Sequence, residues 1–535
     1  MFKQRIQKLK VVWFTILVGL TTIGLVCKTE VQPVTAQNES NSLNRSPPAP
    51  ISIKQIRFIG NTVFSDNQLR KIVAPTRGEG LSFAELYTLR SRVSDYYAEQ
   101  GYVSTSALIP TQNFADGIVE IQIIEGSLKA VEIEGLSYLN RSYIDSRLPP
   151  VGKVLNLDVL RKSLVRLKDN PLIQDLKVDL LEVSPGQNLI NLEITENNPV
   201  QSSFAVTNTF SPSVGKLGGT AEIDYHLLGH GDLVSLAYTH TESNGLRRYN
   251  AGYSLPVNSF DGKASFSYIN ADARIIEEPL TPLDIQADFE VYQLGFRQPI
   301  NLNEDSELAL EAQAELVDSQ SFIEEDIPNS FVEGLEDGES QVTALRFIQE
   351  YFSRNDKNSV AVRSQFNLGL DLFDATVNEV GRDGLFWSWQ GQTQWLNKFN
   401  NLLLVSSLNV QLTDDKLLPI EQITLGGNSS VRGYRQNLSL GDNGVIGNVE
   451  LQVPLIRSLT SSVQVIPFVA SGTVWNNSSE KIDTNTLVSL GLGLSYELRE
   501  LIEARIDYAI PLIEANAPED FTTEQEFSFV LLVQP

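Results

Sequence analysis

The sequence predicts two small α/β domains followed by a 16-stranded antiparallel transmembrane β-barrel. Three observations support this fold class. Residues 51–198 hold two successive runs of the order strand, helix, helix, strand, strand. Residues 199–535 hold segments of roughly ten residues in which apolar and polar side chains alternate, as in strands with two different faces. The long connections between these segments occur at every second position, which is typical of a barrel with short turns at one end.

The N-terminus has the pattern of a secretory signal. Basic residues precede the apolar run Val11–Val26, and residues 34–36 read Val-Thr-Ala, a small-residue cleavage site. We expect residues 1–36 to be a signal peptide, with a membrane anchor as the alternative, and residues 37–50 to be a linker. Cleavage at this site would remove the only cysteine, Cys27, so a disulfide framework and a cysteine metal site are excluded from the mature chain.

Residues 51–126 are predicted to form the first domain. A strand ends at the Gly60-Asn61 pair, and a capping box of Ser82 and Glu85 begins the longer of two helices. Two strands follow, the second over Ile118–Glu125. Helical spacing places the following residues on the buried face of the longer helix: Leu86, Leu89, Val93 and Tyr96 or Tyr97.

Residues 127–198 are predicted to repeat this order. The longer helix covers Leu157–Lys168, and strands follow over Leu176–Val183 and Leu189–Thr195. The apolar face of this helix is predicted to hold Leu157, Leu160, Leu164 and Leu167. Two successive domains of one topology are an internal repeat, in which the order of elements is matched but the residues are not.

Residues 199–535 are predicted to form the barrel. A soluble sandwich buries the apolar side of such strands, whereas an outer-membrane barrel turns it to lipid, so periodicity alone leaves both open. Sixteen segments begin near Ser202, Thr220, Leu233, Leu246, Lys263, Ala287, Ser306, Gln341, Ser359, Leu385, Leu402, Gly444, Ser462, Thr486, Leu501 and Glu526. Short turns follow even-numbered segments and the long loops follow odd-numbered ones. This asymmetry favours the closed membrane barrel, which leaves no backbone edge unpaired in lipid.

Composition excludes several classes of function. The net charge of −25 repels nucleic acid, because phosphate binding needs clustered Lys and Arg. The three histidines, His226, His230 and His240, lie in one hairpin region without a metal-binding pattern, and we expect them to be solvated or lumen-facing. No phosphate-binding loop or nucleophile elbow is present. We therefore expect no enzymatic activity, no cofactor and no metal.

Four stretches carry a resemblance to a known family. GNTVFS with EQGYVSTSALIP (60–65 and 99–110) resembles a first polypeptide-transport-associated (POTRA) domain, and residues 170–197 resemble a second. LGGNSSVRGYR with GDNG (425–444) is similar to the long loop between barrel strands 11 and 12, and PFVASGTVW (467–475) is similar to the strand 13 motif. The chain thus resembles transporters of the two-partner secretion family, the haemolysin and filamentous-haemagglutinin secretion proteins.

The resemblance implies a function and a set of residues. Periplasmic POTRA domains would receive a large, unfolded, β-helical exoprotein, and a barrel in outer-membrane lipid would pass it to the cell surface without ATP. The loop would fold back into the lumen through Val431, Arg432, Gly433 and Tyr434, and the strand 13 motif comprises Phe468, Ala470 and Gly472. The alternatives are an outer-membrane protein insertase of the same superfamily, which would carry more POTRA domains, and a passive porin, which needs none.

Two departures from the family pattern matter. The strand 13 motif usually reads F-x-D-x-G, and its aspartate is the expected partner of the loop arginine, but Ala470 stands there. A guanidinium in a lumen still needs acceptors, so we expect Arg432 to pair with a lumen-facing acid of another strand. The candidates are Glu450, Glu503 and Asp507. Some members also carry a plug helix before the first POTRA domain, and residues 37–50 are too few for one.

An exposed strand edge beside a helix is the expected binding place for an unfolded partner, because it recruits an extended segment by β-augmentation. We expect this edge in the first domain, at the strand Tyr102–Ile109 beside the helix Phe83–Gln100. The alternative is that it is plain surface. The candidate contacts are Tyr102, Val103, Ser104, Thr105 and Leu108.

Overall fold

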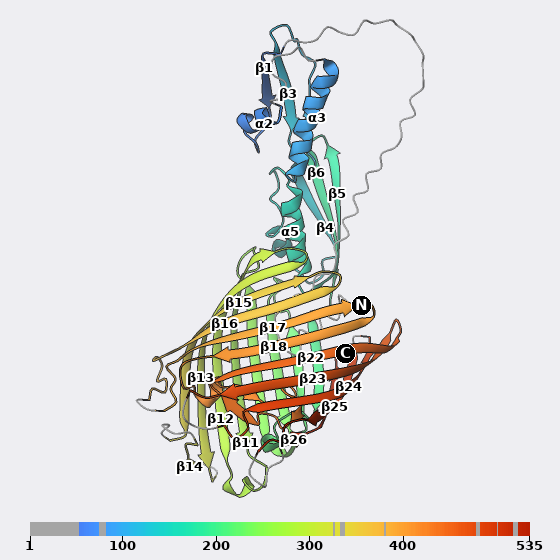
Figure 1. The fold of residues 1–535 in the computed structure, drawn as a ribbon. Helices are drawn as coiled ribbons and strands as arrows, with labels where there is room; N and C mark the ends of the chain where they lie inside the picture. Colours follow the sequence, from blue (N-terminus) through green and yellow to red (C-terminus); the bar gives the residue numbers. More distant parts are fainter. Residues whose placement is uncertain are drawn as a thin grey trace. The chain divides into compact units, whose positions relative to one another are not determined.

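A computed structural model describes residues 53–73, 82–324, 327–331, 337–378, 381–477, 482–499, 501–516 and 523–535. The predicted signal peptide (1–36), the linker (37–50) and the expectation that this linker holds no plug lie outside these residues. The chain divides into two compact units, Met1–Asn197 and Asn198–Pro535 (Figure 1). None of the described helices combines the length and the apolar character that crossing a bilayer requires.

The first domain is a small two-layer α/β fold. Its elements are β1 (Gln55–Ile59), α2 (Asp66–Val73), α3 (Phe83–Glu99), β2 (Ser106–Leu108) and β3 (Ile118–Ile124). The sheet order is β1-β3-β2, with β1 parallel and β2 antiparallel to β3. Both bonds of the predicted capping box form at the start of α3. The predicted face of this helix is buried, with Leu86, Leu89, Val93 and Tyr97 in the core.

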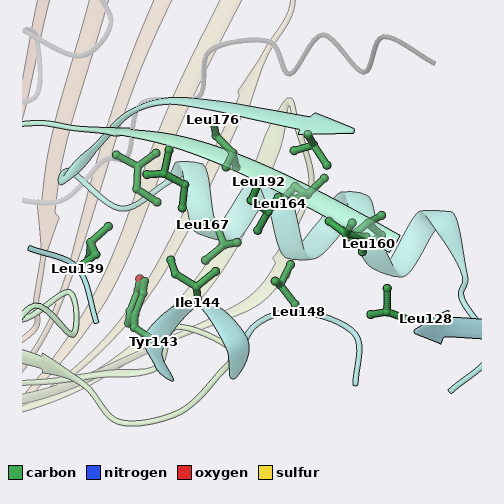
Figure 2. Close-up of a cluster of buried hydrophobic side chains, with 14 of the residues drawn as sticks. Leu128, Leu139, Tyr143, Ile144, Leu148, Leu160, Leu164, Leu167, Leu176 and Leu192 are labelled. Atoms are coloured by element: carbon green, nitrogen blue, oxygen red, sulfur yellow. The ribbon is translucent and has the colours of Figure 1, made fainter. Parts of the chain in front are cut away.

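The second domain repeats this topology. Its elements are β4 (Ser127–Glu134), α4 (Arg141–Asp145), α5 (Leu157–Lys168), β5 (Ile173–Ser184) and β6 (Gln187–Glu196), in the sheet order β4-β6-β5. Figure 2 shows Leu160, Leu164 and Leu167 of α5 in one cluster with Leu176 and Leu192 of the sheet. The helical spacing of these leucines therefore identified the buried face correctly.

The repeat extends to individual glycines, which the sequence comparison of the two domains did not find. Gly60 and Gly135 each follow the first strand of their domain with a φ of +90° and +85°. A Cβ at Gly60 would collide with the carbonyl oxygen of Ile123, and one at Gly135 with that of Ile194. Both the positive φ and the close approach require glycine. In each domain, the chain thus leaves its first strand in a turn that packs directly against the domain's last strand.

A glutamate holds the chain after this turn in each domain. Glu125 accepts hydrogen bonds from the backbone N–H groups of Thr62 (2.7 Å) and Val63 (2.9 Å), and from the Tyr97 hydroxyl (2.9 Å). Glu196 accepts equivalent bonds from the backbone N–H groups of Tyr138 (2.7 Å) and Leu139 (2.9 Å). In both domains the carboxylate satisfies backbone donors that no strand partner reaches.

Glu125 is expected to make the stability of the first domain depend on pH. Burial raises the pKa of Glu125, but the hydrogen bonds from Thr62, Val63 and Tyr97 outweigh burial and hold this pKa below its ordinary value. The stabilisation is therefore complete above the ordinary glutamate pKa of about 4.3 and is lost as pH falls through the lowered value. At neutral pH we expect Glu125→Gln to cost about 1 kcal/mol, because the carboxylate is only half-buried.

Hydrogen exchange of the amides between 55 and 125 in the full chain measures this cost. Wild type and Glu125→Gln are compared at the same pH, so that the intrinsic exchange rates cancel. The protection of wild type should exceed that of the variant at neutral pH and converge with it as pH falls below the lowered Glu125 pKa. An undiminished difference in acid would contradict the assignment.

Among the described residues, sixteen strands form a closed antiparallel barrel, as predicted. The first and last of them, β7 and β27, pair with each other to close it. These strands are β7 (Val200–Thr207), β8 (Gly218–Tyr225), β9 (Leu233–Thr241), β10 (Leu246–Pro256), β11 (Lys263–Arg274), β12 (Gln286–Leu302), β13 (Ser306–Ile323), β15 (Glu339–Arg354), β16 (Asn358–Leu370), β17 (Trp387–Phe399), β18 (Leu402–Leu412), β22 (Asn443–Arg457), β23 (Ser461–Trp475), β24 (Thr486–Leu498), β25 (Ile502–Pro511) and β27 (Phe527–Val533). The two-residue β14 (Ile327–Pro328) extends the pairing of β13.

The two faces of the barrel wall differ in polarity. On β25, Ile506, Tyr508 and Ile510 are 45%, 48% and 43% exposed on the outside, whereas Asp507 and Ala509 are buried on the lumen side. A soluble sandwich would bury the apolar side of this alternation instead. The outward apolar band therefore suits lipid.

The connections differ at the two ends of the barrel. One end has the short turns 303–305, 355–357, 400–401 and 458–460, and the other has the longer connections 275–285, 371–386, 413–442 and 512–526. The pairing order places these two sets at opposite ends (Figure 1). The chain enters and leaves the barrel at the end with the short turns.

Candidate functional site

The longest connection, 413–442, is folded rather than extended. After the 3-10 turn η5 (Pro419–Glu421), its strands β19 (Ile423–Leu425) and β21 (Ser439–Gly441) pair as a hairpin. Between them, β20 (Gly433–Tyr434) pairs with β26 (Glu524–Gln525) from the last connection. The Val-Arg-Gly-Tyr motif therefore lies in the part of the loop that contacts the barrel wall.

The guanidinium of Arg432 lies in a buried cluster of charges. It is 2.5 Å from the Glu450 carboxylate and 3.4 Å from that of Asp507, and it stacks over the Phe468 ring at 3.6 Å from the centroid. Arg505 contacts the same two acids, at 3.1 Å from Glu450 and 2.9 Å from Asp507. Two cations thus face two anions, which leaves this charge quartet (Arg432, Arg505, Glu450 and Asp507) neutral as a whole.

The three acids proposed from the sequence differ in their positions. Glu450 of β22 and Asp507 of β25 contact Arg432, whereas Glu503, on the same face of β25 as Asp507, forms no ion pair with it. Arg505 was not among the functional residues predicted from the sequence. Its position between Glu503 and Asp507 in the lumen-facing pattern was the available signal.

Ala470 lies in an apolar cluster instead of an ionic one. It is fully buried, and its neighbours are Leu425, Val431, Tyr434, Ile446, Val474 and Leu487. A carboxylate here would be surrounded by aliphatic side chains. Acids on β22 and β25 therefore surround the loop arginine where the family pattern uses an acid of strand 13.

Two glycines allow the loop to approach the wall. Gly433 has a φ of +94°, and a Cβ there would lie 3.0 Å from the Cβ of Ala509. At Gly472 on β23, a Cβ would lie 2.5 Å from the Leu425 side chain. The positive φ makes a side chain at position 433 strained, and a side chain at position 472 would require Leu425 to shift.

Tyr434 fixes the next residue of the motif. Its hydroxyl lies 2.8 Å from the carbonyl oxygens of both Val488 and Ile513, and it accepts a hydrogen bond from the Ile513 N–H at 3.1 Å. The ring is 1% exposed. This hydroxyl therefore ties the loop to the end of β25 as well as to β24.

Asp442, in the Gly-Asp-Asn-Gly stretch, joins three connections. Its carboxylate is fully buried and forms an ion pair with Arg382 at 3.0 Å. It also accepts hydrogen bonds from the Gln422 amide (2.8 Å) and from the backbone N–H groups of Leu417 (3.1 Å) and Asn477 (2.9 Å). The stretch carries part of the family resemblance, but no role for Asp442 was predicted from the sequence.

The start of the loop has a separate attachment. Glu421 of η5 lies 2.7 Å from the Arg346 guanidinium of β15, which also pairs with Glu315 of β13. All three side chains are at most 10% exposed. The loop is thus attached to two separate parts of the wall by buried ion pairs.

The proposed binding edge of the first domain is shorter than expected. The predicted strand Tyr102–Ile109 is wrong in extent, because β2 covers only Ser106–Leu108. The backbone N–H of Thr105 bonds to the carbonyl of Tyr102 in a turn that precedes the strand. Of the five candidate contacts, Val103 and Leu108 are 50% and 39% exposed.

The other candidates at this edge have partners within the two domains. The Tyr102 ring packs edge-on against Phe64. The Ser104 hydroxyl accepts a hydrogen bond from the Asn188 amide of the second domain at 3.1 Å, and the buried Thr105 hydroxyl accepts one from the Gly126 N–H. Ser104 therefore belongs to the joint between the two domains.

Within the described ranges, no group of histidine, cysteine and acid side chains has metal-binding geometry. His226 is buried and not solvated as expected. Its ring nitrogen Nδ1 lies 2.6 Å from the Asp232 carbonyl oxygen, within the turn between β8 and β9. The histidines were expected to be solvated or lumen-facing, and the solvated alternative is wrong for His226, whose burial the contact with the Asp232 carbonyl explains.

The two α/β domains, the closed barrel with an apolar outer face and the loop held against the inner wall define an outer-membrane transport barrel with POTRA domains. Residues 186–496 match the family described as haemolysin secretion/activation protein ShlB/FhaC/HecB, and residues 51–126 match the POTRA domain of ShlB type. The chain belongs to this haemolysin secretion/activation family.

Similar proteins agree with this assignment. The outer membrane transporter CdiB of Escherichia coli is 22% identical over 500 residues, which cover 86% of this chain and 81% of that protein. The hemolysin transporter HpmB of Proteus mirabilis is 22% identical over 414 residues, 74% of this chain and 70% of its own length. The solved structure of CdiB from Escherichia coli has a TM-score of 0.73 at 19% identity and covers 94% of both chains.

These findings define the class and the location of the protein. It is an outer-membrane transporter of the two-partner secretion family, with its POTRA domains in the periplasm. The solved structure of CdiB from Acinetobacter baumannii, with a TM-score of 0.70 at 16% identity, covers 100% of this chain and 97% of its own and shares the fold. The resemblance stated from the sequence is thereby confirmed.

Proposed function

We propose that this chain transports one secreted exoprotein, which its POTRA domains bind unfolded in the periplasm and its barrel passes to the cell surface without ATP. The observation that carries the proposal is a free sheet edge on each α/β domain. Within the described residues, β2 pairs only with β3, and β5 pairs only with β6. An unfolded chain has unpaired backbone groups, which such edges satisfy by β-augmentation.

The edge of the second domain adds to the one proposed from the sequence. Strand β5 runs over 12 residues, and Leu181 and Val183 near its end are 45% and 47% exposed. In the first domain, Val103 and Leu108 offer apolar contact beside the short β2. Alternate side chains of an added strand would meet these residues, so a strand-rich exoprotein, such as a β-helical one, fits the edges best.

Transport without ATP requires another source of direction. An exoprotein that is unfolded in the periplasm and stable once folded outside lowers its free energy by crossing, by the few kcal/mol typical of domain stability. The loop in the barrel must then give way to the passing chain. The contacts that attach the loop are ion pairs and hydrogen bonds, which can break and re-form without any covalent step.

The proposed function is tested by deleting the gene and comparing culture supernatants and outer membranes. We expect one secreted protein to disappear from the supernatant while the outer-membrane proteins stay unchanged, and we expect expression of this chain to restore it. A general loss of outer-membrane proteins would instead identify an insertase. An unchanged supernatant would overturn transport.

The binding edge is tested in the restored strain. Val103→Lys with Leu108→Lys should reduce the secreted protein about tenfold, because two charges would be desolvated against the incoming strand. Val159→Lys is the control for an added surface charge, since Val159 is 53% exposed on the helix α5 of the second domain. Equal secretion by both variants would contradict binding at this edge.

A further inference from the structure

The second arginine of the loop, Arg435, contacts a different part of the barrel from Arg432. Its guanidinium forms a two-pronged ion pair with Glu277, at 2.5 Å and 2.6 Å, and donates a hydrogen bond to the Ser213 hydroxyl at 2.7 Å. The side chains of Arg435 and Glu277 are only 11% and 15% exposed. Paired planar groups of this kind form strong, well-oriented hydrogen bonds.

The residues that bind Arg435 also contact one another. Glu277 lies in the connection 275–285 between β11 and β12, and Ser213 lies in the 3-10 turn η2 (Pro212–Val214) between β7 and β8. The Ser213 carbonyl accepts a hydrogen bond from the Ile276 N–H at 2.8 Å, and its hydroxyl lies 3.3 Å from the Glu277 carboxylate. The two connections are therefore already tied together where Arg435 docks.

Arg432 and Arg435 attach the loop to different parts of the barrel. The charge quartet lies on β22 and β25, so that Arg432 is held by the inner wall. Arg435 is held by two connections, the one between β7 and β8 through Ser213 and the one between β11 and β12 through Glu277. The two arginines, only three residues apart, thus fix this segment of the loop both to the wall and to the long connections at one end of the barrel.

We propose that Arg435 and Glu277 form an outer latch that keeps the loop inside the bore when no exoprotein is present. Arg432 holds the loop to lumen-facing acids of the wall and Arg435 holds it to the long connections, so that loss of either attachment leaves one end of the segment free to move. Arg435 is thus a positioning residue for the resting, closed state. This inference rests on the proposed transport function, which gives the bore a cargo.

The outer latch is tested with the purified full chain in planar lipid bilayers, without any exoprotein. Arg435→Gln and Glu277→Gln should each raise the fraction of time spent open about tenfold, the effect of removing one partner from a largely buried charge pair. The exchange of charges, Arg435→Glu with Glu277→Arg, should return the open fraction toward wild type. Recovery in the exchanged pair would show that the two charges act on the open fraction through each other.

Asp284→Asn is the matched control. Asp284 lies in the same connection and pairs with Arg274 at 2.6 Å, but it does not contact the loop. Its φ of +43° is one that asparagine tolerates. This variant should conduct as wild type does, and heat-modifiable migration on unboiled gels shows that every variant holds a folded barrel.

Two results would overturn the outer latch. One is single variants that conduct as wild type does, and the other is an exchanged pair that is as open as the single variants. Neither measurement uses an exoprotein, so both stand apart from the supernatant comparison. If the protein does not transport an exoprotein, the supernatants will be unchanged by deleting the gene. The bilayer recordings will still show whether Arg435 and Glu277 hold the loop.

Discussion

Replacing Arg432 with alanine is expected to destabilise the barrel by about 3–5 kcal/mol and to abolish secretion, because it leaves an uncompensated buried charge. Glu450 and Asp507 would then share Arg505 alone, and the quartet would carry a net negative charge. The contact of the guanidinium with the Phe468 ring would be lost as well. The temperature at which the unboiled protein loses its folded migration measures the first effect, and supernatant analysis the second.

A double variant distinguishes charge balance from simple loss of contacts. Arg432→Ala with Glu450→Gln removes one charge of each sign and leaves Arg505 facing Asp507, so part of the lost stability should return. Arg432→Lys should fall between wild type and alanine, since it keeps the charge but not the planar fork. A double variant less stable than Arg432→Ala would refute the role of charge balance.

Replacing Asp442 with alanine is expected to have a comparable effect at the end of the barrel with the long connections. The Arg382 guanidinium and the donors from Leu417, Gln422 and Asn477 would lose a shared buried acceptor. The cost should be about 3–5 kcal/mol, because one buried carboxylate supplies an ion pair and three hydrogen bonds that are lost together. Hydrogen exchange should become faster in all three connections together, 371–386, 413–442 and 476–485.

Asp414→Asn is the control for this variant. Asp414 is an exposed acid in the same connection, so its neutralisation should change stability by less than about 0.5 kcal/mol. Limited proteolysis of intact cells gives a second readout, since loosened connections become cleavable. Faster exchange confined to 413–442 would show that Asp442 does not join the three connections.

Strand positions were predictable because the pattern repeats every two residues. Each of the sixteen predicted starts lies within two residues of an observed barrel strand. The same alternation identified Glu450 and Asp507 as lumen-facing, and it identified Glu503 as lumen-facing too. Alternation shows which face of the wall a side chain occupies but not its height along the bore, so it cannot tell which of two acids on one face of a strand meets Arg432.

The contacts that hold the loop were less predictable. Arg435 and Glu277 are 158 residues apart in sequence, and both lie in connections without periodicity. Asp442 gathers donors from three such connections. The strand in the first domain was overextended because Val103 and Ser104 fit a strand pattern, whereas hydrogen bonds of Thr105 form a turn there instead. Local patterns report strands well and long-range partners poorly.

The position of Ala470 has a consequence for how such barrels diverge. The guanidinium needs a balance of charge around it, and acids from two flanking strands supply it here. Once those acids are present, the strand 13 position is released to become aliphatic and to pack against the loop. The requirement at this site is then a balance of charge around the arginine and not an acid at one fixed position. A search for the F-x-D-x-G motif alone would miss related barrels that bind the loop arginine with acids of other strands.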